Sequence, residues 1–336
     1  MKIYDSDGWV NWPSIYPEIK FICAMTGPRG TGKTYGLLKY IVEHDIQFIY
    51  LRRLRSQLDI CAADESGNPF KAVNRDLGTE IMVESTRNNV RFIRVDADGG
   101  PRVIGYGAAL STVATVRGID YSDVDCIVFD EFIANTGERP VKGEYQAFLN
   151  FVETVNRNRE LSGHSPVKVF LLGNANTLCN PYFVAWHFMG TALRMIRGEQ
   201  MVYRTPDDTR VMILLLNSEI SKRKKETALY QTADTDFVSM AIDNAFRTDA
   251  TRIGARKLTD CRHVVSIGEI GIYQLKSTGE HYVSSTINRD LYYEENDINI
   301  KLFKTRFALL KQIFFYDLML FESYDIELLF RAYFDI

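Results

Sequence analysis

The sequence predicts an α/β protein in which helices flank a largely parallel β-sheet, followed by a smaller α+β unit. Three observations support this fold class. Over the first two thirds of the 336 residues, short runs of β-branched and apolar residues alternate with stretches of helical periodicity. A glycine-rich turn joins the first apolar run to the first helical stretch, and polar residues end several later runs. This alternation is typical of parallel strands that are connected by helices.

The predicted strands are short apolar segments. Single strands are expected at residues 20–25 (KFICAM), 47–53 (QFIYLRR), 125–132 (DCIVFDEF) and 167–176 (VKVFLLGNAN). Residues 90–107 predict a hairpin, because the Asp-Gly-Gly-Pro sequence at 98–101 suits a turn. The predicted helices cover residues 34–45 and 143–160, and apolar side chains recur at helical spacing in the second.

The composition of the sequence changes after about residue 200. Residues 217–237 are polar and charged, as in a linker. Residues 263–287 contain three short strands separated at glycines, and the helical tail that follows has an apolar face formed by Phe303, Phe307, Leu310 and Phe314. We therefore predict three domains, at residues 1–200, 201–248 and 249–336.

Composition and charge restrict the possible partners. The formal net charge is −3 and the sequence pI is about 6.0, so any contact with nucleic acid needs a local basic patch or a ring of copies. The five cysteines form no C-x-x-C pair, which favours a reducing compartment. Neither a signal peptide nor an apolar run of membrane length is visible, and we expect a cytosolic protein with no membrane partner.

The glycine-rich turn satisfies the pattern G-x-x-x-x-G-K-[ST] at residues 27–34. Glycines let backbone N–H groups turn toward phosphates, and the amino end of the following helix favours negative charge. In this pattern the lysine reaches the β- and γ-phosphates, and the hydroxyl of the last residue ligates Mg²⁺. A chance glycine-rich turn is the alternative, and the flanking strand and helix argue against it. The residues expected to bind the nucleotide are Gly27, Arg29, Gly30, Thr31, Gly32, Lys33 and Thr34.

An acidic pair ends the predicted strand at 125–132. Asp130 is expected to hold Mg²⁺ through water, together with Thr34, and Glu131 to orient and polarise an attacking water. An ordinary solvated strand end is the alternative. A glutamate at this place favours hydrolysis over phosphoryl transfer to a metabolite, because kinases must exclude water.

Further polar residues follow other strands and helices. Asn174 is a candidate sensor of the γ-phosphate or of the attacking water, whereas Asn176 reads as a turn residue. Arg157 and Arg159 end the helix at 143–160, where they either stabilise the helix dipole or reach the nucleotide of a neighbouring subunit. Arg52 gates the nucleotide, contacts a polyanion or belongs to a solvated strand end.

Taken together, these motifs resemble the DNA-packaging ATPases of small tailed phages of the phi-twenty-nine type. The segments that carry the resemblance, over roughly residues 15–250, are GPRGTGKTY, QFIYLRR, CIVFDEFI, NRNRE, LLGNANTLCNPYF and MAIDNAF. By their match to these motifs, Lys33 and Thr34 correspond to the phosphate-loop pair and Asp130 and Glu131 to the metal-holding and catalytic acids. Further matches are Arg52 to a basic residue of a lid-like segment, Asn174 to the polar sensor and Arg157 to an arginine finger that acts in trans.

The resemblance also implies a machine and a location. It implies an ATPase of the additional-strand, catalytic-glutamate class, working as a pentameric ring at the portal vertex of a procapsid in the host cytoplasm. Its partners would be double-stranded viral DNA, the portal and the procapsid. The sequence leaves open whether a packaging RNA is a further partner. The C-terminal domain is expected to resemble an RNase H-type nuclease that has lost its chemistry. Only Glu269 lies where a first-strand acid would be needed, so we predict no nuclease activity.

A basic run is the candidate DNA contact. Lys222, Arg223, Lys224 and Lys225 follow one another in the predicted linker, and contacts from such residues to phosphates carry no sequence information. A solubilising charged loop is the alternative. The leading hypothesis is thus an ATP-driven DNA translocase that uses ATP and Mg²⁺. A small-molecule P-loop kinase and a non-catalytic, nucleotide-gated assembly protein are the competing hypotheses.

Overall fold

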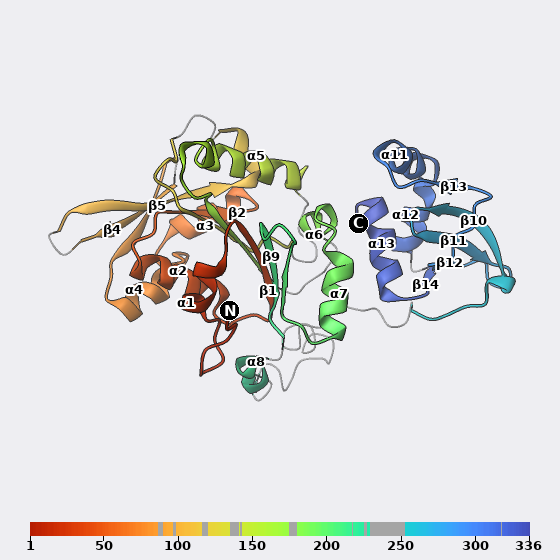
Figure 1. The fold of residues 1–336 in the computed structure, drawn as a ribbon, viewed down its shortest axis with the longest axis horizontal. Helices are drawn as coiled ribbons and strands as arrows, with labels where there is room; N and C mark the ends of the chain where they lie inside the picture. The colour runs from red at the N-terminus through yellow and green to blue at the C-terminus, as the bar shows by residue number, and fades with distance from the viewer. Residues whose placement is uncertain are drawn as a thin grey trace. The chain divides into compact units, whose positions relative to one another are not determined.

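The computed structural model describes residues 1–86, 90–96, 99–115, 120–134, 141, 143–174, 180–216, 218–224, 227–228, 253–316 and 318–336. These residues form two compact units (Figure 1). The first comprises residues 1–177 and 194–246, and the second residues 178–193 and 247–336. Each unit has its own sheet and its own buried core.

The sheet of the first unit has nine strands within the described residues, in the order β3-β4-β5-β2-β6-β7-β1-β9-β8. Their bounds are β1 Ile22–Gly27, β2 Phe48–Arg52, β3 Ile81–Ser85, β4 Val90–Val95, β5 Pro101–Ala109, β6 Cys126–Asp130, β7 Lys168–Asn174, β8 Val202–Arg204 and β9 Arg210–Leu214. In sheet order, the adjacent pairs β5-β2, β2-β6, β6-β7, β7-β1 and β1-β9 are parallel. The pairs β3-β4, β4-β5 and β8-β9 are antiparallel. The predicted parallel sheet and the hairpin at 90–107 are therefore confirmed.

The parallel strands bring their carboxyl ends to one edge of this sheet. β7 lies between β1 and β6, and in that register Gly27 is opposite Asn174 while Asp130 is opposite Leu172. β6 also pairs with β2, which ends at Arg52. Because ligands bind at the carboxyl ends of such strands, this edge is the place to look for a site.

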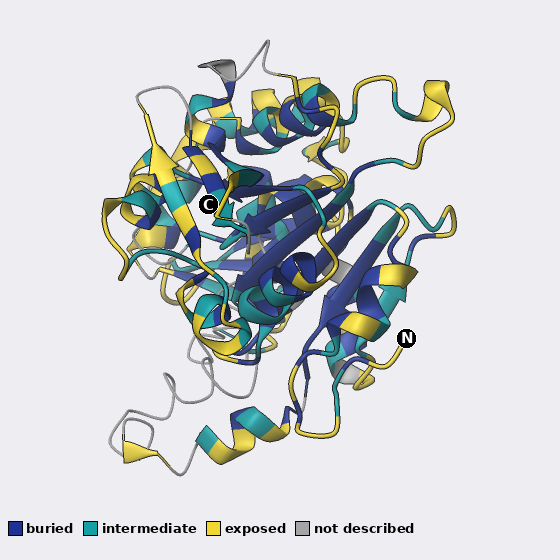
Figure 2. Ribbon diagram, turned by 90° about the vertical axis from the view of Figure 1, so that its left-hand side faces the viewer, coloured by how far each residue is buried: buried dark blue, intermediate teal, exposed yellow. Residues whose placement is uncertain are grey.

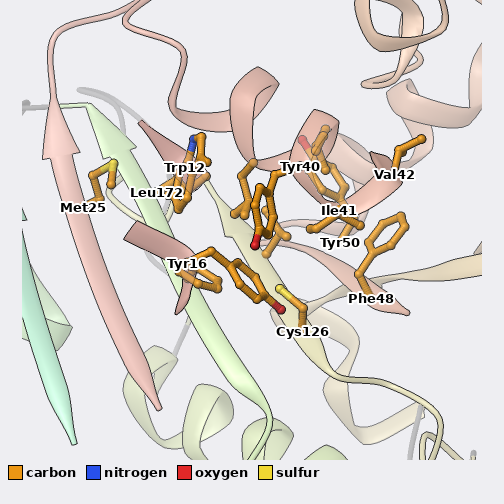
Figure 3. Packing of buried hydrophobic residues seen from close by; sticks show 14 of the residues in the cluster. Trp12, Tyr16, Met25, Tyr40, Ile41, Val42, Phe48, Tyr50, Cys126 and Leu172 are labelled. Atoms are coloured by element: carbon orange, nitrogen blue, oxygen red, sulfur yellow. The ribbon is translucent and has the colours of Figure 1, made fainter. Parts of the chain in front are cut away.

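Helices cover both faces of the sheet. Those of the first unit are α1 (Trp12–Ile15), α2 (Lys33–Glu43), α3 (Arg55–Ala63), α4 (Lys71–Leu77), α5 (Glu144–Asn156) and α8 (Glu219–Lys224), with the 3-10 turns η1 (Tyr16–Glu18), η2 (Leu110–Thr115) and η3 (Glu160–Ser162). α2 and the amino-terminal segment share one core with alternate residues of the strands, as Figure 3 shows for Tyr16, Tyr40 and Cys126. On the other face, the ring of Phe148 in α5 stacks on Phe129 of β6 at 6.0 Å. Figure 2 shows the middle strands of this sheet as deeply buried, and β1, β2, β6 and β7 are buried along most of their length.

The predicted domain boundaries differ from the extent of this sheet. β8 and β9 are strands of the first unit although they lie beyond residue 200; β9 is buried along most of its length between β1 and β8, and the edge strand β8 is half-buried. Residues 229–252, which include the MAIDNAF segment and the C-terminal part of the expected linker domain, lie outside the described residues. The division at residues 200 and 248 therefore stays a prediction.

The second unit is an α+β fold. Its sheet has the order β13-β10-β11-β12-β14. The three predicted short strands correspond to β10 (Cys261–Ile267), β11 (Ile270–Leu275) and β12 (His281–Ser284), which pair in antiparallel order. The remaining elements are α6 (Pro181–Ala185), η5 (Leu258–Asp260), β13 (Tyr292–Tyr293), α11 (Asp297–Arg306), α12 (Ala308–Phe315), β14 (Met319–Phe321) and α13 (Tyr324–Phe334), while α7 (Met189–Arg197) spans the boundary between the units. Phe303, Leu310 and Phe314 are buried in its core, as the apolar face of the tail predicts.

Two further properties concern the described residues as a set. None of their helices is both long and apolar enough to cross a bilayer. Among the same residues, no group of three or more His, Cys, Asp or Glu side chains is placed to hold a metal ion. The likeness of the second unit to a nuclease, and its lack of nuclease activity, stay predictions.

Candidate active site

The glycine-rich turn connects β1 to α2, as its sequence context requires. Gly30 and Gly32 have φ angles of +68° and +86°, a region that residues with a Cβ rarely adopt. Gly27 is required for another reason, because a Cβ there would lie 2.4 Å from Cβ of Leu215. The turn is therefore a compact loop whose backbone runs close to β9 and then enters the first turn of α2.

Lys33, the first residue of α2, is folded onto this loop. Its side chain is almost fully buried, and Nζ donates hydrogen bonds to the carbonyl oxygens of Gly27 at 3.0 Å and Pro28 at 2.6 Å. Burial lowers the pKa of Lys33 to about 7; the charges of Lys224 and Arg29 act in the same direction, and the Asp130 carboxylate opposes them. The two acceptors of Lys33 are neutral carbonyl oxygens, so an anion in the cleft would be a stronger hydrogen-bond acceptor for this side chain.

Thr34 and Asp130 bring two oxygen ligands together. The hydroxyl of Thr34 donates to Oδ1 of Asp130 at 2.7 Å, although 96 residues separate the two in sequence. Tyr50 of β2 donates to Oδ2 of the same carboxylate at 2.7 Å. Burial and the Asp130 charge raise the pKa of Tyr50 far above its ordinary value, so the phenol stays a donor. A hydroxyl and a carboxylate at this separation suit Mg²⁺, which prefers oxygen ligands.

Arg52 connects the two acidic residues. One guanidinium nitrogen donates to Oδ2 of Asp130 at 3.0 Å, and the other to Oε2 of Glu131 at 2.6 Å. Burial alone would lower the pKa of Arg52, but Tyr50, Asp130 and Glu131 outweigh it and raise that pKa. Glu131 has a φ angle of +53°, which is uncommon for a residue with a side chain and stores backbone strain at this position.

A cleft of about 290 Å³ lies over the loop and the strand ends. Asn174 lines this cleft from the end of β7, and Tyr35 lines it from α2. The sequence-predicted residues that the structure brings together around the cleft are Arg29, Gly30, Gly32, Lys33, Thr34, Asp130, Glu131 and Asn174. Thr31 is instead fully buried beneath the loop, where its hydroxyl donates to Pro28 O at 3.1 Å. Asn176 lies outside the described residues.

Arg157 and Arg159 lie at the opposite edge of the sheet. α5 runs from Glu144, which contacts Arg53 just after β2, to Asn156, which accepts from the N–H of Val167 just before β7. The Arg159 guanidinium donates to Val124 O and to Asp125 immediately before β6. Arg159 thus holds a loop of its own chain. Arg157, at φ +40° and with its guanidinium 3.8 Å from Asp120, does not reach the cleft of its own subunit.

Sequence reasoning missed the support that the amino-terminal segment provides to the loop. The N–H of Val10 donates to Thr31 O at 3.1 Å, and the indole Nε1 of Trp12 donates to Gly32 O at 3.3 Å. Trp12 is only 1% exposed. The apolar and aromatic run W-V-N-W at residues 9–12, directly before the first strand, was the available signal. The loop is therefore braced from outside as well as by α2.

The described members of the basic run at 222–225 have different surroundings. Lys222 forms an exposed ion pair with Glu219 at 2.6 Å, and Arg223 is exposed. Lys224 instead donates from Nζ to the carbonyl oxygen of Arg29 in the glycine-rich loop. Lys225 lies outside the described residues, so the DNA contact of this run stays a prediction.

Comparison with known proteins places these features in a family. The DNA packaging protein of Bacillus phage B103 is 27% identical over 250 residues, which cover 72% of this chain and 69% of that protein. The DNA packaging protein of Bacillus phage phi29 is 28% identical over 248 residues, covering 72% and 67%.

Two solved structures have a similar fold along nearly the whole chain. The Phi-28 gp11 DNA packaging motor matches with a TM-score of 0.61 and 19% identity, covering 98% of this chain and 99% of that one. The bacteriophage Phi-29 viral genome packaging motor assembly matches with a TM-score of 0.58 and 19% identity, covering 97% and 99%. A family model described as Podovirus DNA encapsidation protein (Gp16) matches residues 9–286, well over half of the chain, and the protein therefore belongs to this family.

Proposed function

We propose that this protein is the ATP hydrolase of a viral packaging motor, which translocates double-stranded DNA into a procapsid. The observation that carries the proposal is the arrangement at one sheet edge, where a glycine-rich loop, the Thr34–Asp130 oxygen pair and the Glu131 carboxylate converge on one cleft. The DNA-packaging part is supported by family membership and by the names of the relatives. Both parts are needed for a motor, since translocation consumes the free energy of hydrolysis.

The residues of the cleft have distinct roles in this proposal. Thr34 and Asp130 would hold Mg²⁺, which when bound with ATP neutralises charge on the β- and γ-phosphates. Lys33, now bonded to loop carbonyls, is the cation for the same phosphates. Glu131 accepts a hydrogen bond from the attacking water and orients it, and Asn174 provides a polar contact near the terminal phosphate. Arg52 donates to both Asp130 and Glu131, so it reduces the repulsion between the two carboxylates and fixes their positions before the substrate binds.

The competing enzyme class fits this site less well. A kinase for a small metabolite would exclude water and place an acceptor where Glu131 stands, whereas Glu131 is half-exposed and lines the cleft. A nucleotide-gated assembly protein would not need a carboxylate beside the metal ligand. Both alternatives remain outcomes of the experiment described below.

The proposed assembly is a homo-oligomeric ring, a pentamer, at the portal vertex of a procapsid in the host cytoplasm. An RNA scaffold is a further candidate partner. The position of Arg157 supports a ring, because this arginine does not reach the cleft of its own subunit and would serve the nucleotide of a neighbour. The ring would also surround one duplex with several copies of each weak basic contact.

The test compares phosphate release by the wild-type protein and by Glu131→Gln, with and without duplex DNA. We expect the wild type to hydrolyse ATP faster with DNA, and Glu131→Gln to lose about 100-fold or more of the turnover while it still binds ATP. The matched control is Glu153→Gln, which changes an exposed glutamate on α5 and should leave turnover unchanged.

Three results would contradict the proposal. Equal, slow turnover in wild type and Glu131→Gln would favour the assembly protein. Phosphate transfer to a metabolite in place of water would favour the kinase. Strand separation without movement along intact duplex would indicate a helicase rather than a packaging motor.

A further inference from the structure

Lys224 contacts the glycine-rich loop in the same way as Lys33. Lys33 donates to the carbonyl oxygens of Gly27 and Pro28, and Lys224 donates to the next carbonyl oxygen, that of Arg29. Two ammonium groups therefore bind three consecutive carbonyls of one loop. A Cβ built on Gly30 would lie 2.2 Å from Nζ of Lys224, so this ammonium lies directly against the loop.

Lys224 is positioned by buried residues in and just before α8. Ser218 and Ser221 are each 2% exposed, and the spacing of three residues places Lys224 on the same side of α8. The chain just before α8 is held by Tyr4, whose hydroxyl donates to Leu216 O at 2.9 Å. The amino-terminal segment that includes Tyr4 also braces the loop through Val10. The other two described members of the basic run, Lys222 and Arg223, are exposed.

Three basic side chains gather at this turn. Lys33 and Lys224 donate to consecutive loop carbonyls, and Arg29 belongs to the loop itself. The Asp130 carboxylate, which lines the same cleft as Lys33, already accepts from Thr34, Tyr50 and Arg52. A polyphosphate would relieve the repulsion among these cations and replace the loop carbonyls as their hydrogen-bond acceptor.

We propose that Lys224 is a second phosphate-binding lysine, which α8 brings to the terminal phosphate of the bound nucleoside triphosphate. The assignment rests on the proposed function of the loop as a nucleotide site. It assigns Lys224, a member of the basic run that was predicted to contact DNA, to nucleotide binding instead. The contact joins the loop to a segment that is 195 residues distant in sequence. Nucleotide binding at the loop would therefore change the contact that positions α8.

The experiment measures the affinity of the full-length protein for MgATP and MgADP by calorimetry. Lys224→Met removes the charge but keeps most of the aliphatic stem, and Lys222→Met is the matched control two residues earlier on the same helix. We expect Lys224→Met to weaken ATP binding about 10-fold or more and ADP binding less than 3-fold. Lys222→Met should bind both nucleotides as the wild type does. Lys224→Arg, which keeps the charge, should recover most of the affinity for ATP.

Each other outcome overturns the assignment. An equal loss for ATP and ADP would show that Lys224 only supports the loop, and unchanged or tighter ATP binding would show that it does not contact the phosphate. Lys224→Gln provides the same comparison if the methionine variant does not fold. If the wild type binds neither nucleotide, the proposed function itself is wrong, whereas normal wild-type binding with an unaffected Lys224→Met variant removes only the role of Lys224.

Discussion

Arg52 and Glu131 form an ion pair at the carboxyl edge of the sheet, with 2.6 Å between a terminal guanidinium nitrogen and Oε2. The same guanidinium lies 3.0 Å from Asp130. Arg52 is 12% exposed, and its Nε is buried with no hydrogen-bond acceptor among the described residues. A single arginine thus pairs with both the candidate metal ligand and the candidate catalytic carboxylate and offsets part of their combined negative charge.

The first prediction concerns Arg52→Gln. Without the guanidinium, Glu131 loses its orientation and two adjacent carboxylates face an incoming polyanion. A hydrogen bond to a charged group contributes about 1.5–3 kcal/mol, so turnover should fall about 10- to 100-fold. Phosphate release at saturating ATP measures this effect. The control is Arg55→Gln, which breaks the ion pair with Asp59 outside the cleft, and equal turnover in both variants would contradict the assigned role of Arg52.

The second prediction concerns Asp130→Asn. The amide keeps the shape of the side chain but removes the negative charge that would hold Mg²⁺ beside Thr34. The Mg²⁺ concentration that gives half-maximal ATP hydrolysis should rise about 10-fold or more, and a Mg²⁺ titration of phosphate release measures it. Tyr50→Phe is the control, because it removes one donor to Asp130 and leaves the charge in place. If Tyr50→Phe shifts the titration as far as Asp130→Asn does, the carboxylate is not the metal ligand.

The local part of this site was predictable from sequence, and the long-range part was not. The strand, loop and helix at 22–43 follow from an apolar run, left-handed glycines and helical periodicity, all within some twenty residues. Asp130 and Asn174 could also be placed, since parallel strands end at a shared edge. The ion pairs of Arg52 depend on β2 pairing with β6, a register that no short pattern specifies.

Two other features depended on tertiary packing in the same way. Residues 210–214 form β9 beside β1, although the predicted linker domain included them, because an apolar run of five residues does not specify whether it joins a sheet. Lys224 was grouped with its charged neighbours because composition alone does not show which side of α8 faces the loop. In both cases the deciding contact lies far away in sequence.

The third prediction concerns the buried ion pair of Arg53 and Glu144, which joins the end of β2 to the start of α5. Both nitrogen–oxygen distances are 2.9 Å, and the side chains are 1% and 3% exposed. Arg53→Met leaves a buried carboxylate without its cation, so the free energy of unfolding of the first unit should fall by about 3–5 kcal/mol. Arg53→Met combined with Glu144→Gln should recover a substantial part of this loss.

Urea unfolding in a Trp186→Phe background tests this pair, because Trp9 and Trp12 are the remaining tryptophans and both belong to the first unit. Their fluorescence then reports on that unit alone, which is necessary because a chain with two units need not unfold in one step. A double variant that is less stable than Arg53→Met would contradict the assigned role of the ion pair.

The fourth prediction concerns Arg157, which lies near the amino ends of β6 and β7 and so at the edge opposite the cleft of its own subunit. If it stabilises the transition state in a neighbouring subunit, Arg157→Ala alone should lose about 1000-fold of the ATP turnover. Glu131→Gln alone should also be inactive. When the two variants are mixed, an Arg157→Ala subunit provides an intact Glu131, and a neighbouring Glu131→Gln subunit provides an intact Arg157 to the same site. Phosphate release by the mixture should therefore exceed the sum of the separate rates.

The control for this mixing experiment removes the complementing arginine. Arg157→Ala subunits are mixed with subunits that carry both Glu131→Gln and Arg157→Ala, so that every interface lacks Arg157 and no activity should return. Exchange of subunits between rings is verified with fluorescently labelled protein. No recovery despite exchange, or full activity of Arg157→Ala alone, would show that the backbone strain and the Asp120 contact of Arg157 serve its own subunit. Recovery in the first mixture alone requires the residue to act across an interface, because each active pair then draws its glutamate and its arginine from different chains.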